Sequence, residues 1–556
     1  MGFWDWIKNW FLASFGISLI KEGNPQGYIN CVFMTITVVF GIFLFYRTIY
    51  MIVGLFGHSR RFPLAKPDKR YCFVFCARNE EKVIGNLIDS TRDLSYDQSL
   101  LDIIVLADNC SPDDKTAEIA RKKGCIVYER HDLSKCRKGY ALQWLFSQLK
   151  HDLPHGIETY YAYLFMDSDN VMAKDFLNRL NDAFQAGYDV VTGYRNVKNP
   201  SENWLTAIGA FNLYRGPLAS ARARSVFCCN HQITGTGFGI RSFLIRDGWP
   251  CTMLLEDNEM TTRLMAKEPR LRLTLSPSDF AAFFPDGHAT SLTLVKENGV
   301  VLCHLKPSLG ENSELEIPET WAKKRHLSLA SNELGDLVLK DPVTIGGHSF
   351  PTRVTHYVRI TYVEAAQYFD EQPSTFRIAI RQRLRWAKGG MAVWLFPGQR
   401  LLLSFFRRPR WSKYDFFWEI FPYGLVTFLM GFLQLLLTTI FWATGASGTA
   451  VDGWENLWSY LLNITVFQYV GNFFIGVLIV VKEWKRMNFS VTQTIRYLFL
   501  WPLFDMAGVP ISILCLCMHV AWKPIPHHVV ANGNVLLQSQ HQNQMSNETK
   551  HDENPS

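Results

Sequence analysis

The sequence predicts an α/β domain combined with an α-helical transmembrane region. Between Pro63 and Thr262, apolar β-rich runs alternate with helix-like segments, the pattern of a mostly parallel sheet with helices on both faces. Four long apolar stretches lie outside this region. Hydrophobic residues make up 48% of the chain and charged residues only 19%, which is low for a soluble enzyme. At 556 residues, the chain is also too long for one ordinary core.

The α/β region is predicted from five runs and two helical segments. The expected strands are Tyr71–Ala77, Asp102–Ala107, Cys125–Tyr128, Tyr160–Met166 and Asp189–Gly193, with helices at Lys82–Arg92 and Lys115–Lys123. Short apolar runs separated by Gly, Pro and Asn follow and predict a small β-rich insertion. We therefore divide the chain into an interfacial segment with a first membrane helix (1–62), an α/β domain (63–272), the insertion (273–354), the end of the α/β domain with interfacial helices (355–412), three transmembrane segments (413–521) and a polar tail (522–556).

The apolar stretches are each longer than the ~20 residues that span a bilayer. They run over Tyr28–Phe56, Phe416–Trp442, Leu457–Val481 and Ile495–Val520. Lys and Arg cluster at the α/β-domain ends of the first two stretches, whereas the loop Thr444–Asn456 contains neither. By the positive-inside rule, we expect a multi-pass protein of the cell membrane whose central region is cytoplasmic.

Several classes of function are disfavoured by the sequence. The net charge of +7 is modest and its basic clusters flank the apolar stretches, so we expect no nucleic-acid partner. Neither GxGxxG nor GxxxxGK[ST] follows the predicted strands, which argues against hydride transfer and P-loop chemistry. The 12 Cys form no CxxC pair and show no zinc spacing.

Polar residues follow two neighbouring predicted strands. The first strand ends in Ala77-Arg78-Asn79-Glu80, and the second ends before Asp108. A carboxylate at a strand end can bind a ribose hydroxyl or a base edge. Each group alone could equally be a helix N-cap. The presence of both favours a nucleotide site.

Two acidic motifs carry most of the predicted chemistry. Asp167 and Asp169 follow a buried strand, and such carboxylates suit Mg²⁺ or Mn²⁺ bridging substrate phosphates. The alternative is a turn with an Asp cap. Glu256 and Asp257 follow a second apolar run, and we assign Asp257 as general base, with Glu256 next in line. The alternative is acidic residues favoured by a helix N-terminus.

Gln382-Arg383-Leu384-Arg385-Trp386 lies on a predicted amphipathic helix before the second apolar stretch. Arg385 could stabilise a departing diphosphate, and Trp386 could stack on a sugar. Alternatively, these two side chains form an ordinary membrane-interface pair of snorkelling Arg and belt Trp.

Taken in order, these motifs resemble the family 2 glycosyltransferases, specifically the membrane-embedded synthases of cellulose, hyaluronan, chitin and poly-N-acetylglucosamine. The matching residues are Ala77-Arg78-Asn79-Glu80, Asp108, Arg137-Lys138-Gly139, Asp167-Ser168-Asp169, Gly235-Thr236-Gly237, Glu256-Asp257 and Gln382-Arg383-Leu384-Arg385-Trp386. The match covers about Pro63 to Trp386 without the insertion. It departs from many relatives at Leu255, where they have Thr.

The resemblance implies a GT-A catalytic domain, a UDP-sugar donor and inversion to a β-linkage. It implies that Glu80, Asp108 and Lys138 contact the nucleotide, within a substrate-binding set that also holds Ala77, Asn79 and Asp167. The 235–237 motif would lie near the acceptor, and Gln382, Arg385 and Trp386 would cap the site.

The resulting hypothesis is a hexosyltransferase that extends a β-linked polysaccharide processively and exports it. The expected partners are a UDP-sugar donor, a glycan acceptor, the lipid bilayer and, as a further candidate, an accessory export or regulatory subunit. A non-processive membrane enzyme with a lipid acceptor is the alternative. A transporter or receptor would not require Asp167, Asp169 and Asp257 beside apolar runs.

Overall fold

The computed structural model describes residues 25–267, 270–274, 357–445 and 450–518, short strands between 292 and 354, and residues 527, 529, 531, 533 and 536. The expected interfacial segment before residue 25, the connections of the β-rich insertion and most of the polar tail lie outside the described residues. The domain boundaries given above stay a prediction.

An eight-stranded sheet forms the centre of the α/β domain, with the strand order β3-β2-β1-β4-β7-β6-β17-β5. Its strands are β1 (Tyr71–Ala77), β2 (Leu101–Asp108), β3 (Ile126–Arg130), β4 (Ala162–Asp167), β5 (Val171–Met172), β6 (Val190–Val197), β7 (Phe238–Arg241) and β17 (Ile360–Asp370). β1 to β4 pair in parallel, as do β6 and β17. β7 runs antiparallel between β4 and β6, and β5 runs antiparallel to β17, so the sheet is mixed.

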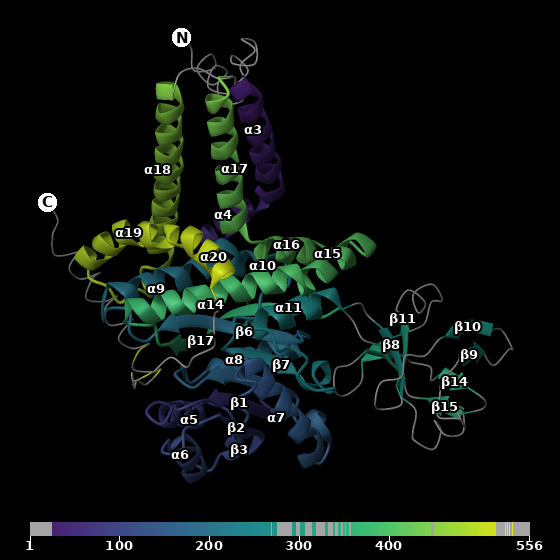
Figure 1. The fold of residues 1–556 in the computed structure, drawn as a ribbon. Coiled ribbons are helices and arrows are strands. Elements are labelled where there is room, and N and C mark those ends of the chain that lie inside the picture. Colours follow the sequence, from purple (N-terminus) through teal and green to yellow (C-terminus); the bar gives the residue numbers. More distant parts are fainter. Residues whose placement is uncertain are drawn as a thin grey trace.

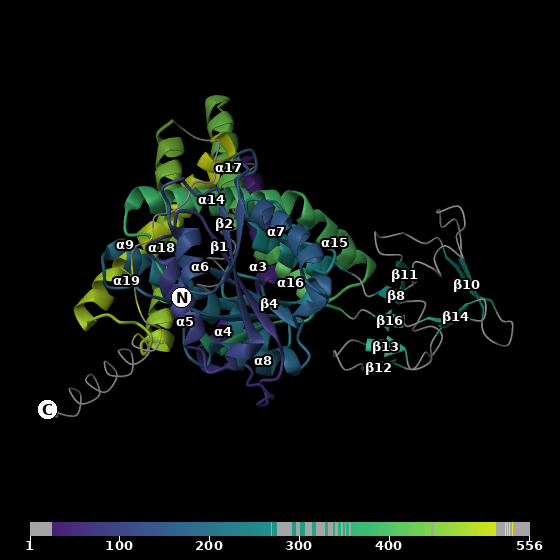
Figure 2. The same cartoon turned by 90° about the horizontal axis from the view of Figure 1, so that it is seen from below.

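Helices cover both faces of the sheet, as predicted, because its central strands are apolar on both sides. In β1, Val74 packs with α7 (Lys138–Asp152), whereas Phe73 and Phe75 pack with α5 (Ile84–Arg92) on the other face. Figure 2 shows the strands between these helix layers. The carboxyl ends of β1, β2 and β4 therefore meet at one edge, where ligands bind in such sheets.

Above the sheet, a layer of helices lies flat and a second group stands upright (Figure 1). The flat layer contains α14 (Phe376–Leu395), α15 (Pro397–Arg407), α16 (Trp411–Glu419), α19 (Val491–Met506) and α20 (Gly508–Cys517). The upright helices are α3 (Pro25–Leu44), α17 (Tyr423–Ala443) and α18 (Ala450–Glu483). The predicted second stretch is thus divided, because its first residues form α16 in the flat layer.

Three described helical segments are long and apolar enough to cross a membrane: Tyr423–Phe441, Thr465–Glu483 and Val491–Cys517. A fourth is α3 together with α4 (Tyr46–Phe56), which meet at a 43° bend. These segments agree with the four apolar stretches of the sequence. The last one, however, forms α19 and α20 in the flat layer rather than an upright helix.

The region of the expected insertion contains short antiparallel strands. β8 (Arg270–Thr274) joins four of them in a five-stranded sheet, and two further pairs stand apart. This sheet lies to one side of the α/β domain (Figure 1).

Candidate active site

A cavity of about 710 Å³ opens at the carboxyl ends of β1, β2 and β4 and extends to the start of α17. Twelve of the fifteen predicted site residues line it: Ala77, Glu80, Asp108, Lys138, Asp167, Asp169, Gly235, Glu256, Asp257, Gln382, Arg385 and Trp386. These residues are separated by up to 309 positions in sequence (386 − 77), so the fold gathers them into one site. Their roles remain predictions.

The three other predicted residues do not line the cavity: Asn79 is exposed, whereas Thr236 and Gly237 are buried, and all three make structural contacts. Asn79 adopts a positive φ of 59°. Its Nδ2 donates to the Ser111 hydroxyl, and its Oδ1 accepts the backbone N–H of Ser111. It therefore fastens the loop after β1 to the loop after β2. Thr236 is fully buried, and a Cβ at Gly237 would lie 2.0 Å from the ring of Tyr368. The 235–237 motif thus supports the site mainly through its backbone.

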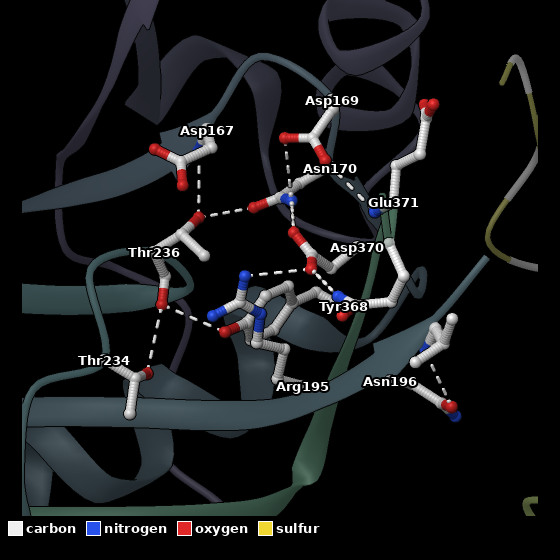
Figure 3. A network of polar contacts seen from close by, with 12 residues as sticks. Asp167, Asp169, Asn170, Arg195, Asn196, Thr234, Thr236, Tyr368, Asp370 and Glu371 are labelled. Atoms are coloured by element: carbon white, nitrogen blue, oxygen red, sulfur yellow. Dashed lines mark hydrogen bonds and ion pairs between the residues drawn. The ribbon is translucent and has the colours of Figure 1, made fainter. Parts of the chain in front are cut away.

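Asp167 is held at the end of β4 from two directions. Its backbone N–H donates to the Thr236 hydroxyl at 2.8 Å (Figure 3). Lys138 Nζ donates to its Oδ1 at 2.5 Å. The same Nζ donates to the Gly235 carbonyl at 2.9 Å. Burial lowers the pKa of Lys138, but Asp167 and Glu256 outweigh burial and raise it overall, so a cation faces the carboxylates.

Asp169 is buried and accepts the backbone N–H of Glu371 at 3.0 Å. Burial alone would raise the pKa of Asp169, but His527 and Lys198 lower it overall. The side chain is therefore ionised and fixed, with the first residue after β17 supplying its donor. This bond connects the segment after β4 with the segment after β17, 202 residues later.

A second acidic residue, Asp370, anchors this arrangement (Figure 3). It accepts Asn170 Nδ2 at 3.1 Å, Arg195 Nη2 at 2.8 Å and Gln372 Nε2 at 2.6 Å. Burial raises the pKa of Asp370 to about 6 despite Arg195. The site assignment from sequence omitted Asp370 and Glu371. The signal was present in the stretch 369–373, which resembles the segment before QxxRW in bacterial relatives.

Asp108 and Glu80 lie at the β1–β2 end of the cavity. Arg130 Nη1 donates to Asp108 Oδ1 at 2.5 Å, and both side chains are buried. Burial nevertheless raises the pKa of Asp108. Burial also raises the pKa of Glu80 to about 8, with nearby Asp169 adding to the effect. Two carboxyl groups are thus placed where a nucleotide would enter.

Glu256 and Asp257 begin α11 (Glu256–Ala266) on the opposite wall. Burial raises the pKa of Glu256 to about 7, although Lys138 Nζ lies 3.9 Å from its Oε1. Burial likewise raises the pKa of Asp257. Leu255 packs against α14, where a Cβ on Gly389 would lie 2.5 Å from its Cγ. The Leu that replaces the relatives' Thr therefore joins two walls of the site through an apolar contact.

The QxxRW residues on α14 form the roof of the cavity. Gln382, Arg385 and Trp386 line it, whereas Arg383 points to α19 and lies 4.1 Å from the ring centre of Phe504. Among the described residues, Arg385 has no hydrogen-bond or ion-pair partner. Its guanidinium is therefore available to an anion.

The far end of the cavity reaches the membrane helices. It is lined by residues of the α16–α17 junction and by one residue of α20: Glu419, Ile420, Phe421, Pro422, Tyr423, Gly424, Leu425 and Ser512. The cavity therefore has a carboxylate-rich end at the sheet and a mostly apolar end at the start of a candidate membrane span.

Among the described residues, no three His, Cys, Asp or Glu side chains converge as a ready-made metal site. Mg²⁺ and Mn²⁺ are commonly held by one or two carboxylates together with substrate phosphates. Asp167 and Asp169 fit that mode, because both line the cavity and follow the same strand. They do not fit a site that binds a cation without substrate.

Two family models match the chain. The model described as glycosyl transferase family 2 matches residues 72–249, and the model described as glycosyl transferase family group 2 matches residues 163–451. The second match covers more than half of the chain, so the protein belongs to glycosyl transferase family group 2. The fold is accordingly GT-A-like, with a curled sheet and added helices that can span a membrane, as the sequence predicts.

Three solved structures are distantly similar to this chain. A mannosyltransferase from Pyrobaculum calidifontis in complex with GDP-Man and Mn²⁺ is 12% identical, with a TM-score of 0.43, over 86% of this chain and 99% of that one. S. aureus TarS 1-349 with UDP-GlcNAc is 17% identical (TM-score 0.24, 35% and 52% covered). Glucosyl-3-phosphoglycerate synthase from Mycobacterium tuberculosis with Mg²⁺ and UDP is 18% identical (TM-score 0.24, 37% and 72% covered).

A search of curated proteins found no match.

Proposed function

We propose that this glycosyltransferase takes a hexosyl group from a UDP-sugar and transfers it, with inversion of the anomeric configuration, to an acceptor delivered from the membrane. We place its catalytic domain in the cytoplasm. The main observation that supports this proposal is that one continuous cavity joins the carboxylates at the sheet to the start of α17. A water-soluble donor can enter one end, and an acceptor confined to the bilayer can enter the other. The preference for UDP rests on the resemblance of the motifs.

The chain's own residues can perform the chemistry of an inverting transfer. Asp257 accepts the proton of the acceptor hydroxyl, a role that its raised pKa supports. Lys138 and Arg385 place positive charge beside the departing diphosphate. When bound, Mg²⁺ or Mn²⁺ would neutralise further charge on that diphosphate, held by Asp167 and Asp169.

The first candidate acceptor is a growing β-linked polysaccharide, with synthesis coupled to export. Trp386 supports it, since this residue is 39% exposed and lines the cavity roof, where a sugar can stack on its ring. Such a surface grips a glycan without recognising its length, as processive synthesis requires.

The second candidate acceptor is a lipid that stays in the bilayer. It is favoured by the upright helices, whose apolar side chains are exposed, for example Phe432 (52%) on α17 and Phe467 (74%) on α18. The candidate span Tyr423–Phe441 has no buried residue in its apolar window. Helices with this much exposed apolar surface resemble a lipid-facing anchor more than the wall of a glycan passage.

The two acceptors are separated by product length. Membranes containing the protein are supplied with single UDP-sugars and Mg²⁺ or Mn²⁺, and released UDP and product size are measured. Long polymer at low turnover, shortened by Trp386→Ala without loss of UDP binding, supports the polysaccharide. Mono- or disaccharide adducts on a lipid support the second candidate. If no UDP-sugar yields UDP above a control with Asp257→Asn, the proposed function is wrong.

A further inference from the structure

The chain returns to the catalytic domain after its last membrane-associated helix. Residues His527, Val529, Ala531 and Gly533, which we call the tail strap, lie beside the carboxylate-rich end of the cavity. In sequence they follow α20, which lies in the flat helix layer. The strap therefore connects the membrane side of the molecule with the site.

The tail strap is held by several independent contacts. Val529 N–H donates to Glu371 Oε2 at 3.0 Å, and Lys198 Nζ donates to the Val529 carbonyl at 2.8 Å. Further along, Asn86 Nδ2 of α5 donates to the Ala531 carbonyl at 2.8 Å. These partners come from the segment after β17, from the segment after β6 and from α5, so the strap is anchored on three parts of the domain.

Gly533 packs so closely that only glycine fits. A Cβ at this position would lie 2.3 Å from the Met172 carbonyl oxygen and 2.7 Å from its carbon. Backbone atoms cannot move aside as a flexible side chain can. A larger residue here would therefore lift the strap without touching the cavity.

His527 lines the cavity and faces its acidic residues. Its Nδ1 lies 3.6 Å from Asp169 Oδ2 and 4.0 Å from Glu371 Oε2. Buried carboxylates without a donor or counter-charge are strongly unfavourable, so their positions depend on such partners. Together, His527 and the Val529 N–H supply polar contacts to both carboxylates.

We propose that the tail strap is part of the donor site, with His527 as a positioning residue that holds Asp169 and Glu371 for a nucleoside diphosphate. This inference rests on the proposed function for the identity of the donor. It adds to that function a segment from the far end of the chain, which the sequence analysis assigned to a polar tail without a role.

Docking of the strap is tested first, without any assay of activity. Asn86→Cys and Ala531→Cys are combined in the full-length protein and treated with a short bismaleimide. We expect a cross-link between the peptides around residues 86 and 531, found by mass spectrometry, and its loss when Gly533→Val is added. Absence of this cross-link in the otherwise unchanged chain would overturn the proposal.

The role in donor binding is tested by titrating UDP in the presence of Mg²⁺. Ending the chain after Pro526, or introducing Gly533→Val, should weaken UDP binding about tenfold, whereas ending it after Gln540 should not. His527→Ala should raise the donor KM by a similar factor and change kcat by less than about threefold. His527→Asn should restore most of the affinity, because its amide nitrogen can take the place of Nδ1.

His528→Ala is the matched control and should bind UDP like the unchanged protein. Unchanged UDP affinity in the chain ending at Pro526 would overturn the strap's role. Failure of the full-length protein itself to bind UDP or any other nucleoside diphosphate would instead refute the proposed function, while the cross-link would still report the docked strap.

Discussion

Two groups of buried or partly buried carboxylates in this protein have pKa values shifted in opposite directions. At the sheet end of the cavity, burial raises the pKa of Glu80 to about 8, of Glu256 to about 7 and of Asp370 to about 6. At the junction between the catalytic domain and the membrane helices, Arg partners outweigh burial and lower the pKa of Glu364 and of Glu419 to about 2.

The difference is one of counter-charge. Glu364 accepts Arg222 at 2.6 Å and Arg486 at 2.8 Å, and Glu419 lies between Arg224 at 3.0 Å and Arg47 at 3.1 Å. In the cavity, by contrast, counter-charge does not outweigh burial for Glu80, Glu256 and Asp370. Carboxylates paired with Arg are typical of structural contacts. Carboxylates without enough counter-charge are typical of a site that binds a charged ligand. Within the cavity lining, Asp169 and the junction residue Glu419 are the two carboxylates whose pKa is lowered.

The largest expected effect tests whether the cavity group binds a charged ligand. Asp169→Asn should abolish turnover and weaken UDP binding while the protein stays folded, because a neutral amide cannot hold the cation that bridges the diphosphate. Removing metal from membranes with EDTA should have the same effect and be reversed by Mg²⁺ or Mn²⁺. Full activity of EDTA-washed membranes without added metal would contradict the metal assignment.

The next effect compares two acidic residues on α11. Asp257→Asn should lower kcat by roughly 10²–10⁴-fold with UDP binding retained, because no group then accepts the acceptor proton. Glu259→Gln is the matched control. Glu259 is buried and accepts the backbone N–H groups of Thr252 and Met253 at 2.9 Å. Its loss should reduce stability by roughly 1–3 kcal/mol and leave kcat within tenfold.

Near wild-type turnover in Asp257→Asn would move the base elsewhere, with Glu256 next. Single-turnover measurements on both variants separate the chemical step from binding.

The site residues were largely predictable because they occur in short motifs at strand ends. Apolar strands such as β1 and β4 are visible in the sequence, and their carboxyl ends meet in any parallel sheet. The prediction was incomplete for Asp370 and Glu371, which reach the site only because β17 pairs with β6 across the insertion. No local pattern encodes that pairing.

The roles of Asn79, Thr236 and Gly237 were also beyond the sequence. A motif shows that a residue type is needed, but it does not show whether the side chain faces the ligand or supports the backbone behind it. The flat course of α19 and α20 was equally hidden, because length and hydropathy describe how apolar a helix is and not its direction.

A third prediction tests the junction group through stability. Arg222 is fully buried, and Arg222→Met leaves Glu364 and Glu483 with only Arg486 as a shared partner. We expect a loss of roughly 3–5 kcal/mol in the free energy of unfolding, measured in detergent, with UDP affinity retained by the folded fraction.

The exposed ion pair between Lys122 and Glu118 on α6 (Thr116–Lys122) is the matched control for this change. Lys122→Met there should leave Tm unchanged, because both side chains of the pair are exposed. A stable Arg222→Met protein with altered UDP affinity would show that the junction acts on the site rather than on the fold.

The smallest effect compares the two groups within one pH titration. Glu256 has a folded pKa near 7 and an ordinary unfolded pKa of 4.5, so between pH 8 and 6 the folded protein takes up protons that the unfolded chain does not. Stability should therefore rise on acidification over this window, by on the order of 1 kcal/mol, because the native state binds more protons. Glu364 works in the opposite direction, but only below its unfolded pKa of 4.5, since its stabilisation is lost as the pH falls toward 2.

Catalysis should decline between pH 8 and 6, because protonation of the Glu256–Asp257 pair removes the base. Activity and Tm measured from pH 8 to 6 should thus change in opposite directions in the wild type. In Glu256→Gln the rise in Tm should become smaller, and the remainder should come from Glu80 and Asp370, whose raised pKa values also lead to protonation in this window. Parallel loss of activity and Tm in the wild type would place the titrating group outside the cavity and break the contrast between the two groups.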